Sequence, residues 1–74
     1  MNAHVAMDAI THTLNRLHEL RCERALALMT PLGDEPRYMA DLDEEITVTT
    51  AAYVASAVTE IASLRAALDA PQAG

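Results

Sequence analysis

Cysteine, glycine and aromatic residues are scarce in this sequence, and lysine, tryptophan and phenylalanine are absent. The one cysteine, Cys22, excludes an intrachain disulfide and is more typical of a reducing cytoplasm than of a secreted scaffold. A chain of 74 residues gains little stability from its own core, because it buries only about 60% of the surface of its unfolded form. Small proteins without disulfides commonly gain stability by assembling with another chain, and we expect the same here.

Positive charge is also scarce, with 5 basic residues against 11 acidic ones and a formal net charge of -6. Nucleic-acid affinity comes largely from cations, and two tyrosines offer few stacking platforms, so we expect no direct nucleic-acid partner. No apolar run approaches the roughly 20 residues of a bilayer span, and the start of the chain does not resemble a signal peptide. We therefore expect no membrane association and a cytoplasmic location, in a bacterium or a phage-infected host.

Two stretches rich in strong helix formers predict two long helices, over about 3–30 and about 50–69. The first stretch contains no Gly or Pro and ends before Pro31 and Gly33, which favour a turn. The second has the alternating three- and four-residue spacing of a heptad pattern, at Val54, Ala57, Ile61, Leu64 and Leu68. Residues 70–74 are predicted to be a frayed tail. The predicted fold class is all-α, a helical hairpin in which the whole chain forms a single domain.

The acidic connection between these helices, about 31–49, allows two interpretations. Residues 37–45 can form a short helix that begins near Pro36, or they can be extended. Residues 46–50, Ile-Thr-Val-Thr-Thr, are β-branched and are predicted to be extended, with the last threonines capping the second helix.

The heptad spacing of the first helix places Arg21 and Arg24 where apolar core residues are expected, before it recovers at Leu28. An alternative apolar path along Leu20, Ala25 and Ala27 requires the buried face to rotate around the helix. A buried guanidinium needs a carboxylate or carbonyl partner, because an unpaired buried charge is strongly destabilising. The connection offers four carboxylates for this role: Asp41, Asp43, Glu44 and Glu45.

Two helices touch along a line, so each apolar stripe of a lone hairpin stays partly uncovered. A homodimer of hairpins that forms a four-helix bundle is the simplest closed arrangement. The stripe is equally suited to a different partner protein, and the pattern does not separate the two. The predicted dimer-interface residues are the apolar members of both stripes: Ile10, Leu14, Leu17, Val54, Ala57, Ile61, Leu64 and Leu68.

Groups that could carry chemistry are few. Cys22 and His18 are the only nucleophile and base on one helix face, and no nearby glycine-rich turn or helix N-terminus would activate the thiol. We therefore expect no enzymatic activity and no cofactor. The same pair could supply two of the four ligands of a zinc ion shared by a symmetric dimer, although a solvated histidine beside a small thiol is the simpler interpretation.

The acidic connection also allows a functional interpretation. Its charges could imitate a phosphate array for a protein that handles nucleic acid, or they could be solvated charges that cap helices and pair with arginines. Tyr38 is the better of the two tyrosines for a partner contact, because Tyr, Arg and Met are enriched at interfaces. The predicted partner-binding residues are Arg37, Tyr38, Met39, Asp41, Asp43, Glu44 and Glu45.

These features favour a non-enzymatic interaction module, a small acidic helical dimer that binds and inhibits a larger bacterial protein and is encoded by a phage or mobile element. One alternative is a structural or scaffold subunit of a helical assembly. The other is a dimeric metal-binding protein that uses His18 and Cys22. The sequence does not identify the partner.

Overall fold

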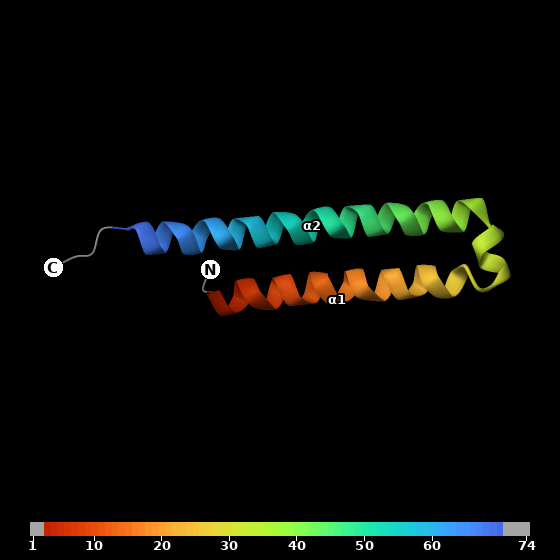
Figure 1. Cartoon of the computed structure of the whole chain (residues 1–74), viewed down its shortest axis with the longest axis horizontal. Coiled ribbons are helices and arrows are strands. Elements are labelled where there is room, and N and C mark those ends of the chain that lie inside the picture. The colour runs from red at the N-terminus through yellow and green to blue at the C-terminus, as the bar shows by residue number, and fades with distance from the viewer. Residues whose placement is uncertain (1–2, 71–74) are drawn as a thin grey trace.

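The computed structural model of the chain describes residues 3–70, and the side chains of residues 7–70. Helix α1 spans Ala3–Ala27, a short 3-10 helix η1 spans Pro31–Asp34, and helix α2 spans Pro36–Asp69. The two long helices lie side by side in opposite directions, joined by η1 at one end (Figure 1). The prediction of an all-helical hairpin is confirmed.

The turn between the helices is compact because of three small or constrained residues. Thr30 is extended, and its Oγ1 accepts a hydrogen bond from the backbone N–H of Leu32 over 3.2 Å. Pro31 then occupies the first position of η1, where a missing N–H costs nothing. A Cβ added at Gly33 would lie 2.9 Å from the Ala27 carbonyl oxygen, so the chain can fold back this closely only without a side chain. For these reasons α1 ends at Ala27, a few residues before the predicted end.

Helix α2 is continuous where the sequence predicts a break. The prediction that residues 46–50 are extended, with Thr50 capping a second helix, is wrong, and of the two interpretations of residues 37–45 the helical one is confirmed. The threonines fit the helix because their hydroxyls bond to the carbonyl four residues earlier. Thr47 Oγ1 donates to the Asp43 carbonyl over 3.0 Å, and Thr50 Oγ1 donates to the Ile46 carbonyl over 2.7 Å.

The core is a single row of side chains along the line where the helices touch. Leu17, Leu20, Ala27 and Leu42 are each no more than 5% exposed, and they form the buried core of the described residues. The buried face of α1 thus follows the alternative path through Leu20 and Ala27. The predicted recovery at Leu28 is wrong: this residue is 57% exposed, because the helix ends one position before it.

Helix α2 is longer than α1. It has 34 residues against 25, a difference of nine, so its C-terminal end runs about 13 Å past the start of α1 at about 1.5 Å per residue (Figure 1). The last apolar residues of the heptad pattern lie on this extension, where Leu64 is 51% and Leu68 81% exposed. The predicted tail beyond Ala70 lies outside the described residues. Within residues 3–70, neither helix combines the length and apolar character needed to cross a bilayer.

Candidate interaction surfaces

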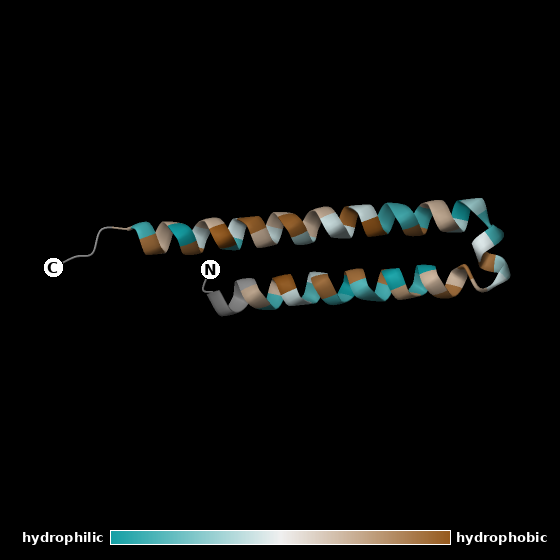
Figure 2. Ribbon diagram, in the orientation of Figure 1, coloured by the Kyte–Doolittle hydropathy of each residue, from teal (hydrophilic) through white to brown (hydrophobic). Residues whose placement is uncertain are grey.

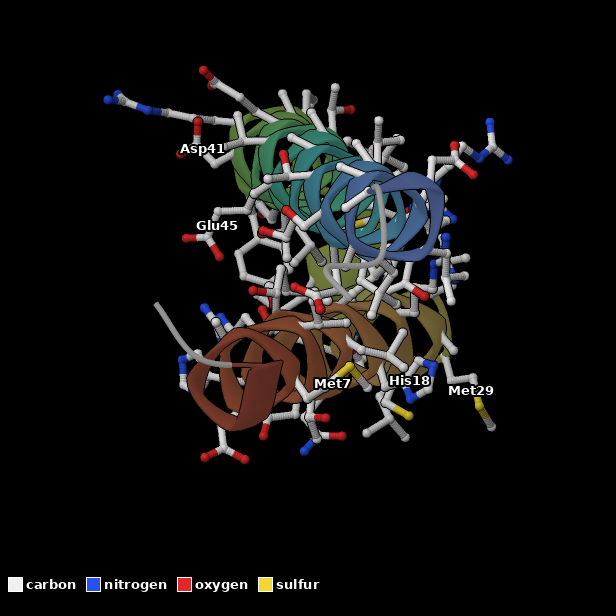
Figure 3. The ribbon with its side chains drawn as sticks, turned by 90° about the vertical axis from the view of Figure 1, so that its left-hand side faces the viewer. Met7, His18, Met29, Asp41 and Glu45 are labelled. Atoms are coloured by element: carbon white, nitrogen blue, oxygen red, sulfur yellow. The ribbon has the colours of Figure 1, made fainter. Side chains whose placement is uncertain are left out.

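On one side of the hairpin, polar contacts join α1 to α2. Arg16 Nη2 lies 2.9 Å from Glu45 Oε2, and the Tyr38 hydroxyl donates to Glu23 Oε2 over 2.7 Å. The hydrogen bond to Glu23, with smaller contributions from burial and from the Glu23 charge, raises the pKa of Tyr38 above its usual value. Asp41 and Glu45 project on this side, away from Met7, His18 and Met29 (Figure 3).

A second ion pair joins α1 to α2 on the opposite side of the hairpin. Arg24 Nε lies 2.7 Å from Asp43 Oδ1. Asp43 and Glu45 point about 200° apart around α2, so they lie on either side of the buried Leu42. The expectation of a buried arginine at this position is not met, because the Arg24 side chain is 42% exposed, but Arg24 does pair with Asp43, one of the four candidate carboxylates. Arg21 is instead exposed, because the buried face turns away from it.

These contacts divide the seven predicted partner-binding residues into two groups. Asp43 and Glu45 form ion pairs with α1, Tyr38 bonds to Glu23, and Met39 is partly buried. The interpretation of the acidic residues as partners of arginines therefore applies to Asp43 and Glu45, although their side chains stay 51% and 59% exposed. Arg37, Asp41 and Glu44 are exposed and are not part of these contacts with α1.

The second half of α2 carries an uncovered row of aliphatic side chains, which we call the apolar edge: Val54, Val58, Ile61, Leu64 and Leu68, from 50% to 81% exposed. Ile61 follows Asp43 by about five helical turns, so it lies on the same side of α2 as Asp43 and opposite Glu45. Strongly hydrophilic residues gather nearer the turn, and apolar residues dominate the middle of α2 (Figure 2). Met7, 51% exposed, also lies on the side away from Glu45 (Figure 3).

The predicted dimer-interface residues differ in how much surface they have to offer. Leu17 is 3% exposed and belongs to the core of the hairpin itself, so it has almost no surface left for a second copy. Ile10, Leu14 and Ala57 are partly buried against the neighbouring helix. The remaining four, Val54, Ile61, Leu64 and Leu68, are exposed members of the apolar edge.

The turn end carries further exposed apolar side chains on more than one of its sides, which we call the turn-end surface: Leu26, Leu28, Met29 and Leu32, from 47% to 83% exposed. Sequence reasoning missed this surface, because the heptad pattern assigns Leu28 to the apolar stripe of the first helix and gives Leu26, Met29 and Leu32 no role. The available signal was the apolar pair Leu28 and Met29 just before Pro31, where a helix has to end.

A shallow groove on α1 runs from His18 and Cys22 toward this turn-end surface, and Leu26, Leu32 and Tyr38 line its far part. His18 and Cys22 thus share one face, as their spacing predicts. In the described part of the chain, no group of three or more His, Cys, Asp or Glu side chains is arranged to hold a metal ion.

Comparison of the chain with protein-family models, with curated proteins and with solved structures finds no match. The features of the molecule that bear on function are therefore its two exposed apolar surfaces and the charges beside them.

Proposed function

We propose that this chain is a non-enzymatic protein-interaction module. Two copies associate through the apolar edge, and the dimer binds and inhibits a larger bacterial protein. The observation that carries the proposal is the apolar edge, five aliphatic side chains from 50% to 81% exposed along one half of one helix. Stable monomers seldom leave a contiguous apolar surface of this kind uncovered.

The energetics of the hairpin support association. Its described core consists of three leucines and one alanine, all in a single row between two helices. Fully burying one aliphatic side chain stabilises a protein by about 1.5–3 kcal/mol. Covering half of each of the five apolar-edge residues would therefore add somewhat less, per copy, than the three leucines and one alanine of the core row provide. Helices in proteins depend on such packing more than on their own propensity.

The turn end is the surface that we assign to the larger partner. Its centre is apolar, with Met29 the most exposed at 83%, and the exposed charged residues Arg37 and Glu44 lie in the first turns of the adjoining α2. An apolar centre with a polar rim is the usual composition of a protein–protein interface. We place this activity in the cytoplasm of a bacterium or of a phage-infected host, because a single cysteine is more typical of a reducing compartment.

A scaffold subunit is the second candidate function, because the two apolar surfaces lie at opposite ends of the hairpin. If the turn end of one copy packed against the apolar edge of the next, the contact would be head-to-tail and would not close on itself. Such contacts build open-ended series of subunits and not dimers.

Light scattering during size-exclusion chromatography separates these candidates. We expect a monodisperse dimer at micromolar concentration, and we expect Ile61→Glu to give a folded monomer, since it places a charge in the apolar edge. Val48→Glu is the matched control, because Val48 is 61% exposed but outside the apolar edge, and this variant should stay dimeric. A mass that grows with concentration would favour the scaffold subunit, and a monomeric unmodified chain would refute self-association.

The partner surface is tested by capture from a bacterial lysate with the tagged chain as bait. Met29→Asp should abolish capture and leave the dimer intact, because the exposed Met29 side chain lies outside the core. Asp41→Asn with Glu44→Gln tests the exposed acidic residues in the same assay. Undiminished capture by both variants would remove the turn end and the acidic residues from the proposal.

A further inference from the structure

Four residues of the apolar edge, Val54, Ile61, Leu64 and Leu68, share one heptad pattern with the partly buried Ala57, whereas Val58 falls at the flanking position e. If Val54, Ile61 and Leu68 are assigned to position a, then Ala57 and Leu64 fall at position d. The seam thus places β-branched residues at two of its three a positions and a leucine at one of its two d positions. In parallel coiled coils, β-branched residues at a with leucine at d favour two strands.

The charges that flank this seam are complementary between copies. Glu60 falls at position g and Arg65 at position e of the next heptad. Side chains that pair within one helix are three or four residues apart, and these two are five apart. Glu60 is partly buried and Arg65 is exposed, and among the side chains of residues 7–70 neither has an ion-pair partner. A spacing of five from g to e is the one at which a residue of one strand meets a residue of a parallel second strand.

We infer that the apolar edge joins two copies in parallel and in register, with Glu60 of each copy paired to Arg65 of the other. This inference rests on the proposed self-association and adds its direction and its charged contacts. The arrangement is two-fold symmetric, so it contains two such ion pairs. The partner's α2 would lie on the side of the hairpin where Met7 is half exposed, which gives Met7 an apolar neighbour.

In an antiparallel arrangement, Glu60 and Arg65 would not form ion pairs between the two copies. In that orientation, position e faces e and position g faces g of the other strand. Arg65 would then lie near Val58 of the second copy and Glu60 near its Ala67, so no opposite charges would meet. The seam also becomes polar at Thr50 and Thr47, which confines the apolar contact to the second half of α2.

Disulfide cross-linking determines the orientation. In a Cys22→Ser background, Ala57→Cys places one thiol in each copy at a d position. In a parallel dimer the two thiols face each other, so mild oxidation should give a covalent dimer. In an antiparallel dimer that aligns a with d, residue 57 faces residue 68, and only a mixture of Ala57→Cys and Leu68→Cys chains would cross-link. That second pattern would overturn the parallel arrangement and leave the proposed dimer standing, whereas a monomer by light scattering would refute both.

A charge exchange tests the ion pairs. Glu60→Arg and Arg65→Glu should each raise the dissociation constant of the dimer several-fold to about tenfold, because each replaces two attractive pairs by two repulsive ones. The two variants mixed together should form the heterodimer preferentially, and the double variant should regain the original affinity. Glu44→Arg is the control on an exposed acidic residue outside the seam, and it should not select between partners. Homodimers and heterodimers in the statistical 1:2:1 ratio expected without preference would overturn the inference.

Discussion

At the scale of single residues, Leu20 matters most for stability. It is 1% exposed, the most buried of the described large side chains, and it lies in the middle of the row that joins the helices. Leu20→Ala should lower the free energy of unfolding by about 2–5 kcal/mol, because it removes buried methyl groups and leaves a cavity. Urea denaturation followed by circular dichroism, at fixed protein concentration, measures the change. Leu26→Ala, at a site 64% exposed, should shift stability by no more than about 0.5 kcal/mol, and an equal loss in the two variants would contradict the core described above.

Tyr38 gives a residue-scale prediction about pH. Its hydrogen bond to Glu23 raises the pKa of the phenol in the folded state. The stabilisation from this contact is therefore complete below the unfolded pKa of about 10, and it is lost as the pH rises through the folded value. In a Tyr53→Phe background, an ultraviolet titration should show the pKa of Tyr38 falling toward its ordinary value when Glu23 is changed to Gln. An unchanged titration curve would show that this contact does not hold the phenol proton.

At the scale of elements, the continuity of α2 is the feature that most shapes the molecule. Val48 lies in the segment that β-branched composition assigned to an extended connection, and its side chain is 61% exposed. Val48→Pro should therefore destabilise the chain by about 3 kcal/mol, because proline removes a helical hydrogen bond and clashes with the preceding turn. Val48→Ala is the control and should be neutral or slightly stabilising. If the proline variant kept the thermal stability of the unmodified chain, residues 46–50 would be an extended linker and not part of a continuous helix.

The same segment shows where sequence reasoning succeeded and where it could not. The hairpin, the turn at Pro31 and the existence of two long helices were predicted correctly from local sequence, namely the strong helix formers and the positions of Pro31 and Gly33. The helical state of residues 46–50 was not, because Ile46 and Thr50 are held by packing against α1 and by threonine bonds to earlier carbonyls. Intrinsic propensity is a weak signal that tertiary contacts override. For the candidate surfaces, the heptad spacing identified the apolar edge, but the turn-end surface depends on where α1 stops, and local patterns leave helix ends uncertain.

At the scale of the whole molecule, charge opposes the association that the apolar edge favours. Each copy has a formal net charge of -6, and most of its acidic residues lie between Glu19 and Glu45, in the half of the hairpin nearer the turn. A parallel dimer brings the two acidic halves to the same end, whereas an antiparallel dimer would hold them apart. Repulsion between exposed charges is screened over about 10 Å at 0.1 M salt.

The parallel dimer should therefore tighten as salt is added, up to the point where repulsion is screened. The two Glu60–Arg65 pairs oppose this trend, but exposed pairs contribute only about 0.2–1 kcal/mol each. Sedimentation equilibrium between 0.02 and about 0.5 M sodium chloride measures the dissociation constant directly, spanning Debye lengths from about 20 Å to a few ångströms. The melting temperature should also rise with protein concentration, since only the folded chains associate. A dimer that weakened steadily with added salt would mean that attraction between opposite charges, and not apolar burial, holds the two copies together.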